Sequence, residues 1–218
     1  MTRGSGMPGR DCPRCARLVE FREEWRAREP GWFNAPVDSF GTADARLLVV
    51  GLAPGLRGAN RTGRPFTGDY AGDLLYATLK EFGFARGEYG ASADDGFELI
   101  DCRITNAVRC VPPENKPTPL EITTCRDFLT ATLNEMRRLR VMLALGRIAH
   151  ETLVLASGAR RAAFPFAHGR THAIGPLILF DSYHCSRYNT NTGVLTPDMF
   201  RNVVKRVREK LDGERDCA

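Results

Sequence analysis

Short apolar runs alternate with amphipathic segments along this chain, and this alternation constrains its fold more than any other feature. Four runs have the β-branched, apolar composition of strands buried on both faces: residues 46–51, 98–108, 140–146 and 176–180. Five segments carry apolar side chains at helical spacing or a helix-start signal: residues 11–28, 69–82, 118–139, 147–155 and 196–211. This order predicts a three-layer α/β/α sandwich with a central four-stranded parallel sheet.

The length of 218 residues fits one domain, which we expect over residues 11–212 with flexible ends at 1–10 and 213–218. A content of 43% hydrophobic and 26% charged residues excludes a wholly disordered chain. No apolar run reaches the roughly 20 residues of a membrane helix, and the first residues lack a secretory signal. We therefore expect a reducing, cytoplasmic location. The net charge of +5 permits a polyanionic partner without requiring one.

Four of the seven cysteines form two groups that can converge on one metal centre: Cys12 with Cys15, and Cys110 with Cys125. Four thiolates suit zinc or an iron–sulfur cluster, and the spacing does not choose between them. The alternative is that these cysteines are small buried apolar residues. The metal site is favoured because the second pair flanks a proline-rich loop. Cys102 is expected in the core, and Cys217 in the tail is expected to be idle.

Polar side chains follow three of the predicted strands, at the sheet edge where ligands of parallel sheets bind. The first such loop has six glycines within residues 51–72, and neither GxxxxGK[ST] nor GxGxxG is present, which argues against a nucleotide-phosphate cradle. The candidate side chains of the three loops are Asn60, Phe66, Thr67 and Asp69, then Asn106, then His184, Ser186 and Arg187. Each has a structural alternative: Asp69 caps a helix, Asn106 caps a turn, and His184 is a hydrogen-bonded structural residue. Their expected convergence favours a site.

Three segments, GLAPGLRGANRTGRPFTGD, ITNAVRCVPPENKPTP and HCSRYNTNTGVLT, together with the four paired cysteines, resemble the family 5 uracil-DNA glycosylases, an iron–sulfur branch of the uracil-DNA glycosylase superfamily. The resemblance spans nearly the whole chain in the same order. It implies a monomeric enzyme that hydrolyses the N-glycosidic bond of uracil in DNA to start base excision repair. It also implies activity on other deaminated bases such as hypoxanthine, and a [4Fe–4S] cluster on the four cysteines. We expect that cluster to be structural.

The resemblance also implies residue roles. Phe66 resembles the aromatic that stacks on the extruded base, Asn106 the amide that reads its edge, and His184 the donor to a base carbonyl. Ala53 stands where much of the superfamily has an acidic or amide residue, and Asp69 resembles the substitute carboxylate. These roles match the physical needs of base extrusion and of charge separation during bond cleavage.

The remaining predicted contacts lie around these residues. Gly51 and Ala53 complete the predicted base-binding set, and the predicted DNA contacts are Asn60, Arg61, Ser186, Arg187, Tyr188 and Asn189. Arg187 and Tyr188 lie where the superfamily inserts side chains into the minor groove. Residues 201–210 form a basic segment that suits phosphates or an ordinary solvated helix face. Cys185 departs from the His-Pro-Ser pattern of the family and removes a fixed φ beside His184.

Two other functions fit parts of the sequence. One is a non-enzymatic zinc module that binds nucleic acid, and the other is a redox protein in which a cluster carries electrons. Within the enzymatic reading, Ala53 and Cys185 leave room for a preference for hypoxanthine or an alkylated base over uracil.

Overall fold

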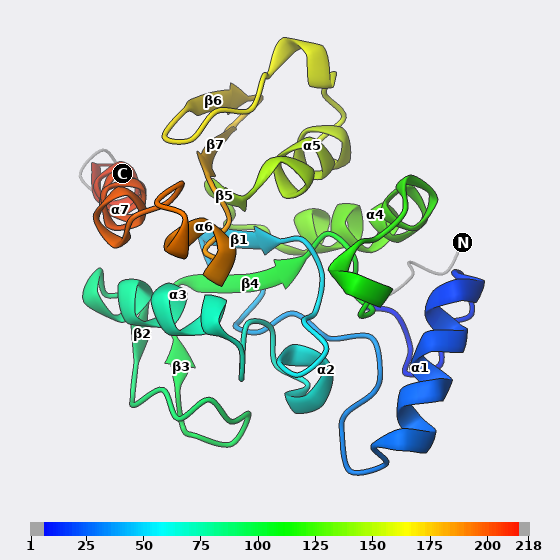
Figure 1. Ribbon diagram of the computed structural model, residues 1–218. Coiled ribbons are helices and arrows are strands. Elements are labelled where there is room, and N and C mark those ends of the chain that lie inside the picture. The colour runs from blue at the N-terminus through cyan, green and yellow to red at the C-terminus, as the bar shows by residue number, and fades with distance from the viewer. Residues whose placement is uncertain (1–6, 214–218) are drawn as a thin grey trace.

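The computed structural model describes residues 7–213, which form a central sheet covered by helices on both faces (Figure 1). The sheet has five strands in the order β4-β1-β5-β7-β6. Their bounds are β1 Leu47–Gly51, β4 Cys102–Asn106, β5 Val141–Leu145, β6 Thr171–Ile174 and β7 Leu177–Ser182. The first four in spatial order are mutually parallel, as predicted. The three-layer α/β class is therefore confirmed.

The predicted count of four strands needs one addition, because β6 pairs antiparallel with β7 at the sheet edge. This strand is short, its alternate residues are exposed, and the chain reverses through Gly175 at φ +58°. The predicted strand 98–108 also divides. Glu98–Leu99 (β3) pairs with Ala85–Arg86 (β2) in a separate two-stranded sheet, and β4 starts only after Asp101, whose φ is +52°.

Seven α-helices lie within the described residues: α1 Ala16–Arg28, α2 Ala59–Thr62, α3 Tyr70–Glu81, α4 Pro119–Glu135, α5 Arg147–Ala156, α6 Arg187–Asn191 and α7 Pro197–Gly213. Two short 3-10 turns cover Pro113–Asn115 and Arg161–Ala163. The predicted starts of two helices are confirmed. Asp69 caps α3, and Thr118 forms a capping box with Glu121 at the start of α4.

Alternate residues of the strands face the two helical layers. Leu47 and Val49 of β1 pack with α3 and α7, whereas Leu48 and Val50 pack with α4 and α5. A third, small cluster places Leu18 of α1 beside the loop after β4 and the start of α4. Helix α1 begins at Ala16 rather than at residue 11, so both cysteines of the CPRC segment precede its first turn.

None of the helices in the described residues is long and apolar enough to span a membrane. The predicted flexible ends fall largely on residues 1–6 and 214–218, which lie outside the described residues, as does Cys217. Residue 10 is in contact with the domain, since Arg26 donates a hydrogen bond to the Arg10 carbonyl at 3.2 Å.

Candidate active site

A pocket of about 640 Å³ opens at the carboxyl ends of β1, β4 and β7. Seven of the predicted site residues line it: Ala53, Phe66, Asp69, Asn106, His184, Ser186 and Arg187. The rest of its wall is Leu52, Gly55, Leu56, Arg57, Gly58, Tyr70, Ala71 and Asn115. The topology thus brings three loops that are distant in the sequence to one cavity, as the sheet-edge argument predicts.

Phe66 and Asn106 form the floor of the pocket. Gly51, which was predicted to bind the base, lies behind these two side chains and does not itself line the pocket. Gly51 and Asn106 are register partners at the ends of β1 and β4. A Cβ on Gly51 would lie 2.6 Å from Asn106 Oδ1 and 2.9 Å from Phe66 Cε2, so only glycine fits here. Asn106 is 3% exposed, and its Oδ1 has no hydrogen-bond partner. A buried acceptor of this kind is costly unless a ligand satisfies it.

His184 lies over this floor, with its ring stacked against that of Phe66 at a centroid distance of 5.9 Å. Burial lowers the pKa of His184 to about 4, which makes the imidazole neutral at pH 7. The segment is held by Asn189, whose Nδ2 donates to the His184 carbonyl at 2.8 Å. A neutral imidazole fixed in this way can donate one N–H into the pocket.

Asp69 combines the two roles considered for it. Its Oδ1 accepts a hydrogen bond from the Gly72 N–H at 3.3 Å and caps α3, which confirms the structural reading. Its other oxygen faces the glycine-rich loop, where a Cβ on Gly58 would come within 2.5 Å of Oδ2. Burial raises the pKa of Asp69, while hydrogen bonds from the Gly72 and Ala71 amides lower it in part. The carboxylate therefore both caps a helix and lines the pocket.

Cys185 is completely buried in the core between its loop and α3. Its thiol donates a hydrogen bond to the Ala71 carbonyl at 3.4 Å. Burial raises the pKa of Cys185 to about 12, so it remains a thiol. The residue that departs from the family pattern thus ties the His184 segment to the first turn of α3.

The loop that carries Phe66 is braced from the β2–β3 hairpin. Phe66 has φ +55°, a left-handed conformation that costs a non-glycine residue free energy. The Tyr89 hydroxyl donates to the Phe66 carbonyl at 3.2 Å and accepts from the Gly68 N–H at 3.2 Å. Arg64 and Asp95 form a buried bidentate ion pair with both N–O distances at 2.7 Å. These contacts hold the strained residue in place.

The short helix α6 carries the predicted DNA contacts near the mouth of the pocket. Tyr188 is 74% exposed, and the exposed Arg187 has its guanidinium 5.2 Å from the ring centre of Tyr70. Ser186 caps the helix by accepting a hydrogen bond from the Asn189 N–H at 3.4 Å. An aromatic and a basic side chain therefore project beside the cavity, where an inserted wedge is needed.

Two residues of the glycine-rich loop are structural instead. Asn60 is 1% exposed, and its Nδ2 donates to Asn34 Oδ1 at 2.9 Å, so we withdraw the prediction that it contacts DNA. Thr67 is also buried and accepts a hydrogen bond from Arg64 Nε at 2.7 Å. Arg61 of the same loop is exposed. Sequence alone did not separate these residues because a glycine-rich loop folds back on itself and buries some of its polar groups.

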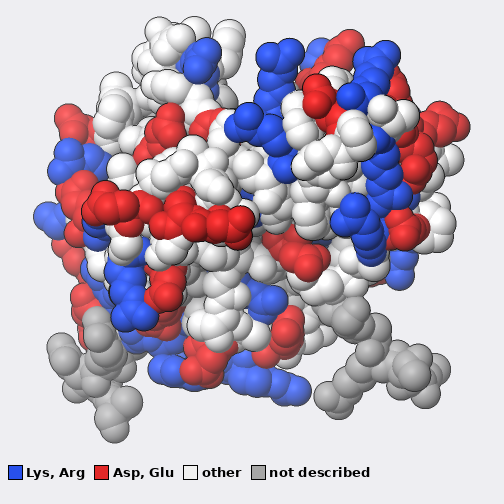
Figure 2. Space-filling model, turned by 90° about the horizontal axis from the view of Figure 1, so that it is seen from below, with Lys and Arg blue, Asp and Glu red and all other residues white. Residues whose placement is uncertain are grey.

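The basic segment 201–210 belongs to α7, and much of its charge is paired. Arg201 contacts Glu81 at 2.5 Å, and Lys205 is within 3.9 Å of Glu209. This supports the solvated-face reading. On the face seen in Figure 2, acidic and basic side chains are likewise intermixed rather than gathered into a field of one sign.

Three pocket residues with polar or aromatic side chains were not singled out in the sequence: Arg57, Tyr70 and Asn115. Asn115 adopts φ +57° in the proline-rich loop, and asparagine tolerates this conformation better than most residues. An asparagine within a proline-rich loop was the available signal. Arg57 is exposed, and a single cation within the glycine-rich segment is a weaker sequence signal.

The four paired cysteines line one small pocket between α1, α4 and the loop after β4. None of them is in a disulfide. Burial raises the pKa of Cys110 to about 12 and that of Cys125 to about 11, so these thiols need an adjacent cation to ionise. Among the described residues, no three of these sulfurs lie within 4.8 Å of one another. A single zinc ion would hold the four sulfurs about 4 Å from one another. Cys102 is buried in β4, as predicted.

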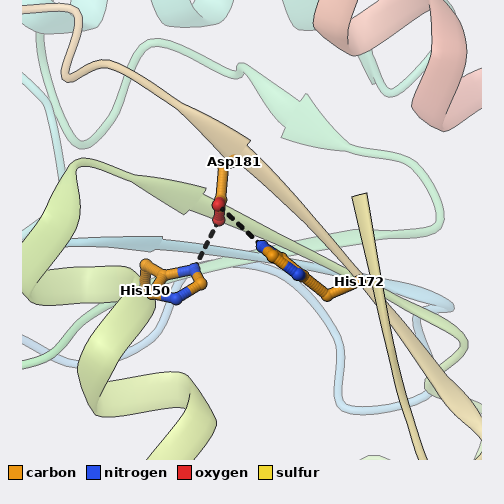
Figure 3. Close-up of side chains that lie close together, drawn as sticks. All are labelled: His150, His172 and Asp181. Atoms are coloured by element: carbon orange, nitrogen blue, oxygen red, sulfur yellow. Dashed lines mark hydrogen bonds and ion pairs between the residues drawn. The ribbon is translucent and has the colours of Figure 1, made fainter. Parts of the chain in front are cut away.

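A second cluster of side chains that could bind a metal consists of His150 of α5, His172 of β6 and Asp181 of β7 (Figure 3). His150 contacts Asp181 Oδ1 through Nδ1 at 2.6 Å and the Phe164 carbonyl through Nε2 at 2.7 Å. His172 and the Ala167 N–H reach Asp181 Oδ2. Because a carbonyl only accepts, Nε2 of His150 carries a proton, and the pairing with a carboxylate leaves a second proton on Nδ1. Burial lowers the pKa of His150, but Asp181 outweighs this and raises it. The cluster is therefore a buried ion pair that braces β7.

Comparison with known proteins agrees with this geometry. Residues 39–208 match the model of the uracil DNA glycosylase superfamily. A type-5 uracil-DNA glycosylase of Thermus thermophilus is 46% identical over 88% of this chain and 90% of its own length. The type-5 enzymes of Pyrobaculum aerophilum and Mycobacterium tuberculosis are 39% and 40% identical over 90% and 93% of the chain, covering 87% and 78% of their own lengths. The chain belongs to the uracil DNA glycosylase superfamily and, within it, to the type-5 branch.

Proposed function

We propose that this protein removes uracil, and also other deaminated bases such as hypoxanthine, from DNA by hydrolysing the N-glycosidic bond. The observation that carries the proposal is the buried, unpartnered Oδ1 of Asn106 on the floor of a pocket walled by Phe66 and His184. Uracil presents an N–H donor flanked by carbonyl acceptors, and this edge is complementary to a carboxamide. The base must be extruded from the helix to reach this floor, at a cost of a few kcal/mol.

His184 stabilises the departing base. Cleavage leaves negative charge on the base, and a donor held at its carbonyl favours the transition state over the ground state. The neutral imidazole donates its N–H without losing a proton. One such donor contributes on the order of 3 kcal/mol, or at least about a hundredfold in rate.

Asp69 acts at the opposite end of the breaking bond. The sugar gains positive charge, which a nearby carboxylate stabilises while a water attacks the anomeric carbon. The small side chain of Ala53 leaves space for that water and for the sugar. Outside the pocket, Tyr188 and Arg187 support the gap that the extruded nucleotide leaves in the base stack. We propose that one copy of the chain, folded as a single domain over residues 11–212, suffices for these steps.

The test uses oligonucleotides that carry uracil, hypoxanthine or thymine opposite each normal base, followed by alkaline cleavage at abasic sites. Wild type should release uracil, and His184→Ala should lose at least about 99% of the single-turnover rate. Leu120→Ala is the control, since Leu120 is 75% exposed on α4 and does not line the pocket. Equal rates for both variants and wild type would remove His184 from this role.

We further propose that Cys12, Cys15, Cys110 and Cys125 hold a [4Fe–4S] cluster with a structural role. The four sulfur donors and their spread favour a cluster over a single ion. Such thiolates require a reducing compartment, consistent with the cytoplasm. Purified protein should be brown and contain four irons per chain by the cluster's stoichiometry, and Cys110→Ala should lose both colour and thermal stability. Colourless protein that contains zinc would favour the alternative of a zinc module that binds nucleic acid.

A further inference from the structure

We propose that Arg22 and Arg109 are the buried counter-charges of the four-cysteine centre, which they neutralise and whose reduction potential they raise. This inference rests on the cluster proposed above. Both arginines line the pocket that the four cysteines share. Both are almost fully buried, at 3% and 1% exposure.

Arg109 has lost its water without gaining an ion pair, and the carboxylates that act on its charge, Asp38 and Glu135, do so from more than 4 Å away. Its two terminal nitrogens donate to Ser39 Oγ and Thr132 Oγ1, each at 2.9 Å, and both acceptors are neutral. Its Nε has no hydrogen-bond partner. Within residues 7–213, no carboxylate forms an ion pair with Arg109. Its own backbone N–H donates to Cys125 Sγ at 3.3 Å. The guanidinium also lies close enough to Cys125 for the two groups to interact electrostatically.

Arg22 is nearly as poorly compensated from the other side of the pocket. One terminal nitrogen donates to the Cys12 carbonyl at 3.2 Å, and its Nε lacks a hydrogen bond. Its ion-pair contact is with Glu23 at 3.6 Å, a side chain that is 54% exposed and therefore well screened. The two guanidiniums thus flank the sulfurs from α1 and from the loop after β4.

The negative charge of the proposed cluster would supply the anion that the two buried arginines lack. Burying a cation costs several kcal/mol unless an anion compensates it, and guanidinium does not neutralise itself by losing a proton. A [4Fe–4S] core of charge two plus, bound by four thiolates, carries two negative charges. Two buried guanidiniums cancel them. Because a nearby cation favours the more negative, reduced state, these arginines must raise the reduction potential of the centre.

Two other arginines provide controls. Arg14 also lines the pocket, but its side chain is 43% exposed and paired with Asp127 at 3.0 Å. Arg103 is 6% exposed, pairs with Glu135 at 3.3 Å and does not line the pocket, although its charge also acts on Arg109. If burial of an arginine alone matters, Arg103→Met should behave like Arg109→Met. If lining the pocket is sufficient, Arg14→Met should behave like Arg109→Met.

The experiment compares wild type, Arg22→Met, Arg109→Met, Arg109→Lys, Arg103→Met and Arg14→Met, all purified without oxygen. Iron and acid-labile sulfide are counted per chain, iron loss to a chelator is timed, and the midpoint potential is measured by spectroelectrochemistry. Arg22→Met and Arg109→Met should lose iron about tenfold faster or more and shift the potential to more negative values. Arg109→Lys should restore the potential because it keeps the charge. The two control variants should match wild type.

The outcomes separate the two proposals. Wild type without iron and sulfide refutes the cluster and this inference with it. Wild type that holds the cluster, with Arg109→Met and Arg22→Met indistinguishable from Arg103→Met in potential and iron loss, refutes the counter-charge role alone. If Arg109→Met does not fold, Arg22→Met and Arg109→Lys still decide, since the first removes a charge and the second retains one.

Discussion

Substitution of Gly51 by alanine tests whether the floor of the pocket is built as described. The added methyl group would overlap Phe66 Cζ and lie 2.6 Å from Asn106 Oδ1. Both neighbours are buried and line the pocket, so relief of the clash pushes one of them into the space that the base would occupy. Overpacking of this kind typically costs about 1–3 kcal/mol of stability. For a domain of this size, that lowers the melting temperature by roughly 2–12 °C.

The effect on catalysis should be larger than the effect on folding. Relief of the clash moves the stacking ring or the carboxamide by a substantial fraction of an ångström, and a displacement of about 1 Å can cost about a hundredfold in rate. We expect Gly51→Ala to reduce single-turnover uracil release by about that factor, while binding to DNA with an abasic site changes little. Gly31→Ala is the control, because a Cβ there meets nothing within 4 Å. A folded Gly51→Ala variant with the wild-type rate would refute the reasoning.

Three further predictions concern charge and bracing. The rate of base release should fall in acid with a midpoint above pH 3.8, because burial raises the pKa of Asp69 and only the ionised carboxylate stabilises the sugar cation. Asp69→Asn should release the base about a hundredfold more slowly, and its pH–rate profile should lack this fall in acid. Tyr89→Phe should slow base release severalfold in single-turnover assays, since it removes two hydrogen bonds of about 1 kcal/mol each that flank Phe66; an unchanged rate would show that the brace is dispensable. Because the pKa of His150 is raised in the folded state, its ion pair with Asp181 stabilises the fold fully below about pH 6.5 and less as pH rises through the pKa of the folded state. Denaturant titrations should therefore show a free energy of unfolding that declines on the alkaline side, and His150→Gln should remove that decline.

The parallel sheet and its main helices could be predicted from the sequence because their signals are local. The buried run at residues 47–51 and the capping box of Thr118 each depend on a few neighbouring residues. The antiparallel edge strand was missed for the same reason. Thr171 and His172 carry no apolar signal of their own, and their strand is defined by pairing with β7.

The site was partly predictable because the ends of parallel strands meet at one edge. That rule correctly brought Phe66, Asn106 and His184 to one cavity. It did not distinguish a polar side chain that faces the cavity from one turned into the loop, as Asn60 is. The orientation depends on a partner, Asn34, that lies 26 positions away and has no motif.

The chain that leaves α1 connects the cysteine pocket to the glycine-rich loop that lines the base pocket. Beyond the cysteine pocket, the chain leaving α1 hydrogen-bonds to the glycine-rich loop, where Phe33 donates to the Arg61 carbonyl at 3.0 Å and Asn34 to the Asn60 carbonyl at 3.1 Å. Few apolar contacts other than Leu18 secure the helix. Oxidative destruction of a metal centre there would free this segment and loosen the wall of the base pocket in the same cooperative event. Repair capacity would then be lost under the very oxidising stress that damages DNA.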